Sequence, residues 1–324
     1  MSDFHPRHRS VVDRFFFDWY SAETLGAVRF YFGLSLTLYL LSQYPQLLTL
    51  DLFGPQFHYT LPIWYFGLLG IDHNIPWLIP PVMLLMVAAC LCFAFGKWTK
   101  PAVVVILLTV FYLKGVRDSF SGDVHHREIP VVALLVLFLA SKCDRGLGID
   151  ARKKNLPPIA DWEASWPLRA MQVYLAFFYL WALVGKLRVS GLFWFEHGGR
   201  IQETLIARAV RDGFDANGDV VNLALAWKLA QTPDLVFVFG VGVFVFELFI
   251  PLILLVRDWR PRLILLVGAT VFHISNFMLM NVQFYLYPLL FVVFFDMAKV
   301  HTWLRSKLRL REPEPARTAP PASG

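Results

Sequence analysis

The sequence predicts an all-α protein, a polytopic membrane helix bundle with about eight transmembrane helices. Of its 324 residues, 57% are hydrophobic and only 17% are charged, which is too apolar for the core of a soluble domain of this size. The apolar residues gather in runs long enough to cross a bilayer as helices. The basic residues lie in short clusters between these runs, which is the pattern that orients helices in a membrane.

Eight apolar runs qualify as membrane spans, because about 20 apolar residues cross the hydrocarbon core as a helix. The spans are expected at residues 23–43, 78–95, 101–113, 129–141, 167–185, 234–256, 261–280 and 282–297. The third and fourth runs are short. They need flanking residues to reach across, such as Lys114 and Gly115 for the third, or Arg127 and Glu128 for the fourth.

Positive charge predicts the orientation of the spans, since Lys and Arg are retained in cytoplasmic connections. Basic clusters precede the first span and follow the second, fourth, sixth and eighth, whereas residues 44–77 contain no Lys or Arg. Both termini are therefore expected on the cytoplasmic side of a membrane, which we take to be a bacterial inner membrane. Lys114, Arg117 and Arg127 oppose this pattern, because they fall between spans three and four on the outer side.

One membrane domain is expected, with a short segment at each end. Residues 1–20 form a cytoplasmic N-terminal segment, 21–300 the membrane domain and 301–324 a cytoplasmic tail. The tail is expected to be largely disordered, since its Pro, Ala, Arg and Ser residues have nothing to bury. Between spans five and six, apolar residues at helical spacing predict two helices in the membrane interface, near 200–211 and 220–229.

Neither nucleic acid nor a metal ion is an expected partner. The net charge is +6, but the basic residues do not form one polar face of the kind that binds DNA or RNA. The adjacent His125 and His126 lack the i, i+4 spacing of a chelating pair. Asp123 and His273 complete a metal site only if tertiary contacts bring them together. Membrane lipid is the partner that the composition predicts.

Two ionisable residues inside spans are expected to pair with each other. An ionisable side chain in a span costs about 2.5–3.5 kcal/mol on insertion scales. Arg29 lies about two turns from the cytoplasmic end of the first span, and Glu247 lies at a similar depth in the sixth. We therefore predict a structural ion pair between Arg29 and Glu247.

Polar residues gather toward the outer side of the predicted bundle. The set consists of His125, His126, Lys186, His273, Asn276, Gln283 and Tyr285. A lysine held neutral beside an apolar pocket can act as a base, and Lys186 closes the fifth span where such a pocket would lie. The alternative is that Lys186 only anchors its helix by snorkelling. His273 and Asn276 are three residues apart and so share a helix face.

Several separated stretches of the chain carry a family resemblance. They are Trp166-Pro167-Leu168-Arg169 with Gln172, Tyr179, Gly185-Lys186-Leu187, Trp194, Gly198-Gly199-Arg200, Phe272-His273-Ile274-Ser275-Asn276, Gln283-Phe284-Tyr285 and the loop ending in His125-His126. In their order along the chain these stretches resemble the HTTM family, which includes vitamin K-dependent gamma-carboxylase. The likeness covers about residues 20–300.

The resemblance implies a lysine base and a reduced quinone such as vitamin K. In the carboxylase, a lysine in the corresponding segment accepts a proton from vitamin K hydroquinone, which would assign that role to Lys186. A histidine before the fourth span supports that site, which implicates His125 or His126. The carboxylase has two adjacent lysines where this chain has Gly185 and Lys186, and it carries a large domain for its protein substrate. Propeptide-directed glutamate carboxylation is therefore not expected of this chain alone.

Two classes of function follow. The first is a membrane enzyme that acts on a quinone-like or lipid substrate at the non-cytoplasmic side, with Lys186 as base and His125, His126 or His273 assisting. Asn276, Gln283 and Tyr285 would bind the substrate. The second is a non-enzymatic accessory membrane protein for the maturation or export of a secreted peptide, with a protein or peptide partner. The polar cluster favours the enzyme, whereas the short tail favours the accessory protein.

Overall fold

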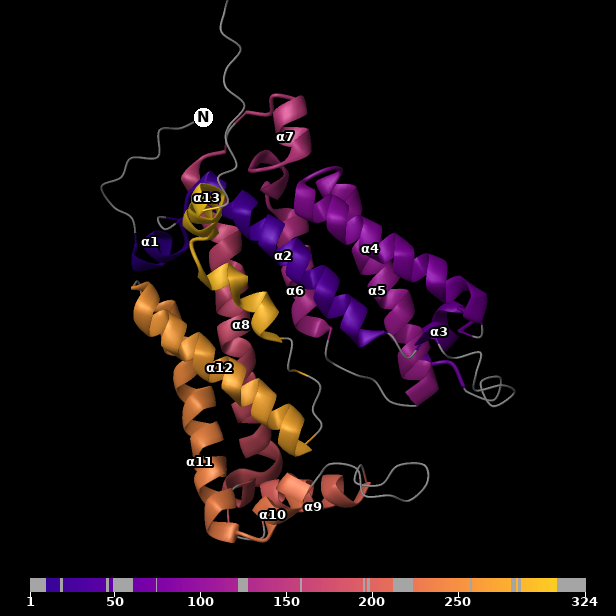
Figure 1. Ribbon diagram of the computed structural model, residues 1–324, viewed down its shortest axis with the longest axis vertical. Helices are drawn as coiled ribbons and strands as arrows, with labels where there is room; N and C mark the ends of the chain where they lie inside the picture. Colours follow the sequence, from indigo (N-terminus) through magenta and orange to yellow (C-terminus); the bar gives the residue numbers. More distant parts are fainter. Residues whose placement is uncertain are drawn as a thin grey trace, which may run out of the picture.

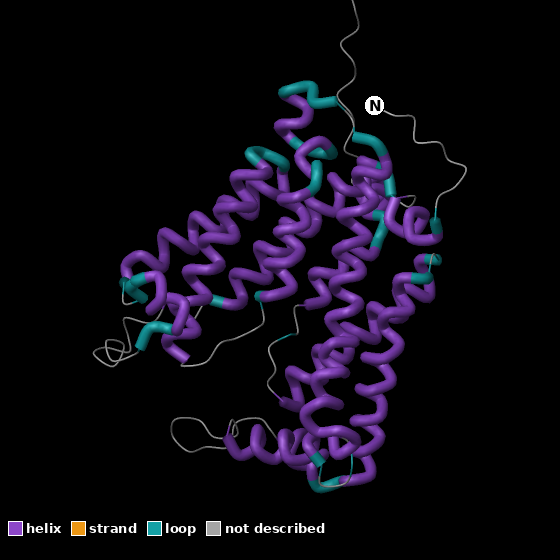
Figure 2. The backbone as a smooth tube through the Cα atoms, turned by 180° about the vertical axis from the view of Figure 1, so that it is seen from behind, coloured by secondary structure: helices purple, strands orange, loops and turns teal. Residues whose placement is uncertain are grey.

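Every regular element in the described part of the chain is a helix, and no strand occurs there (Figures 1 and 2). The computed structural model describes residues 10–17, 20–44, 47–48, 61–73, 75–121, 128–157, 159–194, 196, 199–211, 224–256, 258–280, 284 and 287–307. The predicted all-α fold is confirmed.

The described helices follow one another in this order, with η marking the 3₁₀ helices: α1 (Val11–Phe17), α2 (Ala22–Gln43), α3 (Trp64–Leu69), η3 (Pro76–Leu78), α4 (Ile79–Phe95), α5 (Thr99–Ser121), α6 (Ile129–Ala140), η4 (Cys143–Arg145), α7 (Ile149–Lys153), α8 (Asp161–Ser190), η5 (Gly191–Trp194), α9 (Arg200–Arg211), α10 (Ala224–Ala230), α11 (Pro233–Phe249), η6 (Ile250–Leu254), α12 (Trp259–Met280), η7 (Tyr287–Phe294) and α13 (Met297–Lys307).

Within the described residues, six segments are long and apolar enough to cross a membrane, as expected of an integral membrane protein. They are Ala22–Ser42, Pro76–Phe95, Thr99–Phe120, Asp161–Trp194, Pro233–Leu254 and Trp259–Leu279. The third of them was predicted from a short apolar run. In the structure it gains length at its C-terminal end, because the helix continues through Lys114 and Gly115 to Ser121.

In the described residues, the fourth and eighth predicted spans are shorter than full-length spans, so six of the eight expected segments reach full length there. Helix α6 has 12 residues, or about 18 Å at about 1.5 Å per residue. In place of the eighth span, the described residues form the 3₁₀ helix η7 of eight residues, or about 16 Å at about 2.0 Å per residue. Both fall short of the hydrocarbon core of about 30 Å.

The sequence sets several helix ends directly. Helix α2 begins after Ser21, whose hydroxyl accepts a hydrogen bond from the backbone N–H of Thr24 at 3.3 Å and so caps an otherwise unpaired donor. Helix α4 ends at Gly96, which has a φ of +69°. Glycine reaches this left-handed conformation without a steric penalty, which suits it to end a helix.

The short helices mark two opposite ends of the bundle (Figure 1). We call the end with α1, α7 and α13 the α7 end, and the end with α9 and α10 the α9 end. Helices α8 and α12 run from the α7 end toward the α9 end, and α11 runs back. Helix α7 and helix α13 both finish on basic residues, so the basic clusters predicted to be cytoplasmic gather at the α7 end.

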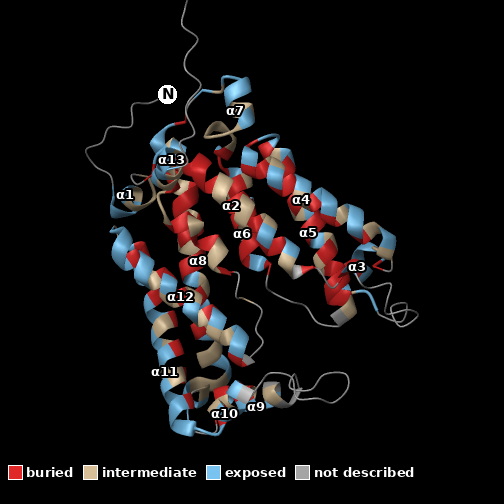
Figure 3. Cartoon of the chain, in the orientation of Figure 1, coloured by how far each residue is buried: buried red, intermediate tan, exposed pale blue. Residues whose placement is uncertain are grey.

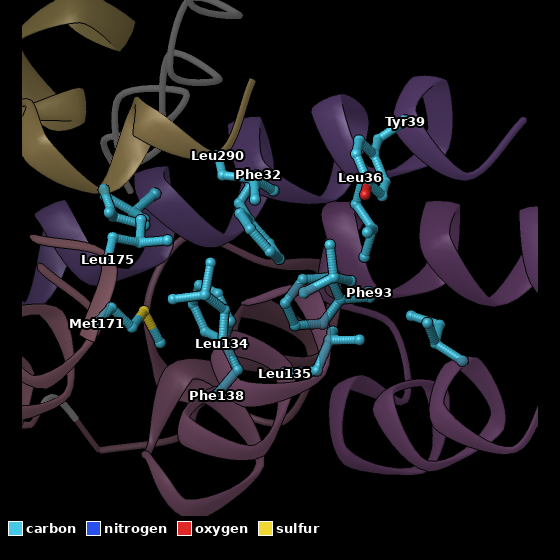
Figure 4. Packing of buried hydrophobic residues seen from close by; sticks show 14 of the residues in the cluster. Phe32, Leu36, Tyr39, Phe93, Leu134, Leu135, Phe138, Met171, Leu175 and Leu290 are labelled. Carbon is cyan, nitrogen blue, oxygen red and sulfur yellow. The ribbon is translucent and has the colours of Figure 1, made fainter. Parts of the chain in front are cut away.

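The main buried core lies where α2, α4, α6, α8 and η7 meet. Figure 4 shows Phe32, Phe93 and Phe138 converging from three of these helices. The ring centroids of Phe32 and Phe138 are 5.1 Å apart, and those of Phe93 and Phe138 are 5.2 Å apart. Exposed residues cover the outward faces (Figure 3). Because lipid is as apolar as these rings, close packing rather than removal from water holds such helices together.

A buried network of charges ties the end of α5 to the start of α6. Arg117 donates from Nη1 to Glu128 Oε1 at 2.6 Å and from Nη2 to Glu128 Oε2 at 3.0 Å. Lys114 forms an ion pair with Asp118 one turn further along α5, and Tyr65 Oη lies 3.3 Å from the same carboxylate. We call Lys114, Arg117, Asp118 and Glu128 the α5–α6 network.

This network explains why two basic residues stand on the side predicted to be outer. Lys114 and Arg117 are paired with carboxylates inside the helix bundle and so do not act as free charges in a loop. The positive-charge rule counts basic residues of short connections, and these two belong to a helix. Arg127, the third basic residue that opposed the orientation, lies outside the described residues.

Candidate functional site

A largely apolar cavity of about 290 Å³ lies between α8, α11 and α12 and reaches η5 and α9. Aromatic rings form much of its wall, among them Phe178, Phe239 and Phe272. The Phe272 ring is itself stacked on Phe246 of α11, with 5.1 Å between the centroids. Besides Tyr287 of η7 and Trp194 of η5, the polar side chains that reach this cavity come from four α-helices. They are Tyr179, Lys186, Thr204, Glu247, His273 and Asn276.

Lys186 and Glu247 form an ion pair across the cavity, which we call the α8–α11 pair. Lys186 lies one turn before the end of α8, and its side chain is 21% exposed. The Glu247 side chain is only 2% exposed, and its second oxygen, Oε2, has no hydrogen-bond partner among the described residues. Lys186 Nζ also lies 5.6 Å from the ring centroid of Trp194, where a cation is attracted by the ring face.

The predicted ion pair between Arg29 and Glu247 is wrong. Arg29 Nη1 donates instead to the backbone oxygen of Cys143 at 2.8 Å, and Glu247 pairs with Lys186. Depth alone did not determine the partner, because α2 and α11 both pack on α8 but are not neighbours of each other. The α-helical part of α11 also ends at Phe249, before the predicted end of its span.

A second polar contact lies in the same cavity. Tyr179 Oη and His273 Nε2 are 2.6 Å apart, and both side chains are buried. The other ring nitrogen of His273, Nδ1, has no hydrogen-bond partner in the described part of the chain. Asn276, three residues further along α12, also lines the cavity. Of the predicted site residues, the structure thus brings together Lys186, His273 and Asn276.

Four predicted site residues lie outside the described residues. They are His125, His126, Gln283 and Tyr285. The neighbours that the structure does describe, Phe284 and Tyr287, line the cavity. Among the described residues, no group of three or more His, Cys, Asp or Glu side chains is placed to hold a metal ion.

Helices α9 and α10 close the cavity at the α9 end. Both predicted helices between spans five and six occur, α9 as Arg200–Arg211 and α10 as Ala224–Ala230, while the predicted residues 220–223 lie outside the described part of the chain. They share a small buried cluster with α11 and α12, which includes Ile201 and Leu205. Gln202 Nε2 donates to the backbone oxygen of Ala230 at 2.7 Å. Ile201 and Thr204 of α9 line the cavity. The buried cluster thus holds α9 in place against this end of the cavity.

Gly199 permits the tight turn into α9. A Cβ atom at this position would lie 2.1 Å from the backbone oxygen of Phe193, a distance that no side chain tolerates. The glycine that precedes α9 is therefore required by a close approach of two backbones.

Sequence reasoning missed two residues of the site. The sequence predicts Glu247 in a structural ion pair with Arg29 and does not assign it to the site. Tyr179 lies two turns before Lys186, and that spacing places both on one face of α8. The separation of seven residues between this tyrosine and a lysine at a span end is the sequence pattern that could have indicated Tyr179.

The α8–α11 pair can accept one proton. An ammonium with a carboxylate and an amine with a carboxylic acid contain the same number of protons, so they are two forms of one coupled unit. In apolar surroundings the neutral form costs less desolvation than separated charges. The ammonium–carboxylate form takes a further proton on the carboxylate, and the amine–carboxylic acid form takes it on the amine. Both routes give the same product, a lysine cation beside a carboxylic acid.

Comparisons with protein-family models, with curated proteins and with solved structures find nothing that matches this chain.

Proposed function

We propose that this protein is a membrane enzyme that binds a quinone-like or lipid substrate in the cavity between α8, α11 and α12, with the α8–α11 pair as proton acceptor. The observation that carries the proposal is this ion pair in a covered, aromatic-walled cavity, where Glu247 Oε2 and His273 Nδ1 lack hydrogen-bond partners among the described residues. Buried polar atoms without partners are rare in native proteins. A ligand with hydroxyl or carbonyl oxygens would provide them.

The size and lining of the cavity favour a ring over a long chain. Ligand pockets usually measure about 300–1,000 Å³, and this one, at about 290 Å³, is at the lower limit. Phe178, Phe239 and Phe272 line the cavity with apolar rings suited to an aromatic head group. An attached hydrocarbon tail would extend beyond the cavity into lipid.

The proposed reaction starts with proton transfer from a bound hydroquinone. One hydroxyl group of the hydroquinone loses its proton to the α8–α11 pair, and the electron pair of the broken O–H bond stays on oxygen as a quinol anion. His273 donates a hydrogen bond to the anion from a ring nitrogen, and Asn276 does so from its amide. Dissolved oxygen would then take two electrons from the anion, giving the quinone and hydroperoxide.

The resemblance to the HTTM family supports Lys186 as the amine of this pair. Glu247 joins Lys186 in the proposed acceptor, because its carboxylate forms the ion pair with this lysine. The proton acceptor is thus a pair of residues from two helices, and Lys186 acts within it.

The Lys186→Arg substitution tests the proposal. Arginine keeps the cation and the ion pair but cannot become neutral, because a guanidinium stays protonated at any accessible pH. It therefore holds the Glu247 carboxylate in its charged form, and the pair accepts a proton much less readily. We expect oxygen uptake with reduced menadione, used as a probe quinol, to fall about 10²–10⁴-fold, the usual contribution of a general base. Lys228→Arg is the matched control, because Lys228 is an exposed lysine of α10 outside the cavity.

Folded protein in the membrane must be measured for both variants, so that misfolding is not counted as lost chemistry. Oxygen uptake equal to wild type in Lys186→Arg, at normal abundance, would contradict the enzyme proposal. Such a result would leave the non-enzymatic accessory protein, with a peptide partner, as the function to test next. Mass spectrometry of lipids and quinones that copurify with the wild type would identify the natural ligand.

The orientation that we propose puts the α7 end in the cytoplasm and the cavity toward the outer side. The basic clusters at the α7 end support it through the positive-charge rule. A topology reporter fused after Arg311 should be cytoplasmic. An exported reporter together with a cytoplasmic N-terminus would mean an odd number of crossings, and the short α6 and η7 would be the first segments to re-examine.

A further inference from the structure

A buried cation lies at the α7 end, away from the cavity of the proposed reaction. Arg29 is 1% exposed. Its Nη1 donates to the backbone oxygen of Cys143 at 2.8 Å, and its Nη2 lies 3.5 Å from that of Ala94. Among the described residues Arg29 forms no ion pair, Asp144 acts on it only over a longer range, and its Nε has no hydrogen-bond partner.

Gly96 and Gly148 leave the space that the Arg29 guanidinium occupies. A Cβ atom on Gly96 would lie 2.7 Å from Arg29 Nη2, and one on Gly148 would lie 3.1 Å from both Nη atoms. Any side chain at Gly96 would displace the guanidinium. The backbones of two separate connections thus approach Arg29 closely and fix it in one place.

A cavity of about 190 Å³ opens beside Arg29, between α2, the end of α4, α7 and α13. Arg152 and His301 also line it, and no Asp or Glu is among the described residues that do so. The Arg152 guanidinium has no hydrogen-bond or ion-pair partner in the described part of the chain. His301 Nδ1 lies 3.3 Å from Tyr31 Oη.

Three basic side chains around one cavity, without an acid, make a site for an anion. Leaving a buried charge uncompensated is strongly destabilising, and a bound anion would compensate Arg29. A guanidinium matches the oxygens of a phosphate group with two parallel hydrogen bonds. We propose that this cavity binds a phosphate-bearing anion, held by Arg29 and Arg152 with His301 as a third donor.

The phosphate could belong to a phospholipid head group or to a soluble phosphate compound. The cavity lies among the short helices of the α7 end, and basic pockets between membrane helices on the cytoplasmic side bind anionic head groups. Either source offers the same oxygens to the same three side chains. The site does not depend on the reaction proposed above, because none of its residues lines the other cavity.

Lipid retention tests this site. Wild-type protein is placed in nanodiscs that contain equal amounts of phosphatidylglycerol and phosphatidylcholine. The protein is then released from the nanodiscs in a native mass spectrometer, and the lipids that stay bound are identified by mass. We expect it to retain phosphatidylglycerol preferentially. Arg152→Gln, a change at an exposed residue that should leave folding intact, should weaken this retention about tenfold, the loss of one charge-assisted contact. Lys153→Gln removes the same charge from the same short helix outside the cavity and should not.

Inorganic phosphate distinguishes the two sources. If excess phosphate does not change the retention of phosphatidylglycerol, the ligand is a lipid head group. If phosphate displaces the lipid, or raises the Tm of wild type but not of Arg152→Gln, a soluble phosphate compound is the ligand. Equal retention of both lipids with no effect of phosphate on Tm would overturn the proposal. So would an equal loss of phosphatidylglycerol in Arg152→Gln and Lys153→Gln.

Discussion

Two sets of buried charges in this protein differ in how completely their carboxylates are paired. In the α5–α6 network, both oxygens of Glu128 accept from Arg117, and both oxygens of Asp118 have basic partners. In the α8–α11 pair, one oxygen of Glu247 has a partner and the other has none among the described residues. The first set is packed within the bundle, whereas the second lines a cavity.

The difference indicates which charges hold the fold and which are available for chemistry. A network in which every carboxylate oxygen has a basic partner loses hydrogen bonds if a carboxylate is protonated, so it resists protonation and fixes the ends of its helices. A pair with an unused acceptor beside a cavity has room for a ligand and a place for one more proton. A buried carboxylate with an unused oxygen beside a cavity is therefore the feature that makes the α8–α11 pair a candidate site.

Glu247→Gln gives the largest expected effect and separates chemistry from folding. The amide keeps the shape of the side chain but cannot take a proton, and the remaining lysine stays a cation. Oxygen uptake with reduced menadione should fall about 10²–10⁴-fold, while the free energy of unfolding changes by about 1 kcal/mol, because Lys186 is partly exposed. Chemical denaturation in detergent measures the second quantity. A large loss of stability with normal uptake would reverse the assignment.

Arg117→Met should give the opposite result. The substitution leaves the Glu128 carboxylate buried without its partner, which costs about 3–5 kcal/mol of stability. Less folded protein should reach the membrane. The protein that does fold should keep its oxygen uptake per molecule, since Arg117 does not line the cavity. The double variant Arg117→Met/Glu128→Gln removes the unpaired charge and should recover part of the loss; additive losses would show that the two residues are not coupled.

Tyr179→Phe tests the second contact of the cavity. Removing the hydroxyl leaves both ring nitrogens of His273 without a described partner, which costs about 1–3 kcal/mol. Stability should fall by this amount, and a bound quinol should offset part of it by occupying the freed nitrogen. Thermal unfolding with and without reduced menadione measures both effects. An equal Tm shift with ligand in wild type and variant would indicate that the ligand does not reach His273.

His301→Gln should give the smallest effect, seen only as a function of pH. Burial, with help from the nearby cations Arg305 and Arg152, lowers the pKa of His301 below its ordinary value of 6.5. The unfolded chain therefore binds a proton here at a higher pH than the folded protein does. Stability from this residue is fully present above about pH 6.5 and declines as pH falls toward the lower folded pKa.

The His301→Gln variant should lack this loss of stability at low pH. Unfolding curves between pH 7.5 and about 5 measure the free energy of unfolding for both proteins. Because a bound anion would favour the charged imidazole, excess inorganic phosphate should reduce the decline in wild type. Identical pH profiles for wild type and His301→Gln in phosphate-free buffer would contradict the assignment.

Most of the fold could be predicted from the sequence, because long apolar runs have few alternatives in a membrane. The limits appear where neighbouring segments decide the outcome. The run before Phe294 is as apolar as a true span, yet it forms a 3₁₀ helix of eight residues. The α5 helix extends past its apolar run because buried carboxylates at Asp118 and Glu128 accommodate its charges, and composition does not show such pairing.

The site could be predicted only in part, for a related reason. Spacing along one helix placed His273 with Asn276, and a span-end lysine stood out by itself. The partner of Glu247 depended on which helices pack together, and matched depth could not decide between Arg29 and Lys186. Contacts between helices separated by 61 residues, as those of Lys186 and Glu247 are, leave no pattern in a single sequence.

The length of α8 has a consequence for the proposed reaction. Its 30 residues measure about 45 Å, and a tilt of 20–40° still leaves about 34–42 Å along the membrane normal, more than the hydrocarbon core of about 30 Å. One end of α8 must therefore stand in the head-group layer, and Lys186 lies one turn from the end nearer the cavity. A thicker bilayer would draw this lysine into hydrocarbon and delay the return of its proton to water. Membrane thickness would then regulate turnover without any ligand or partner.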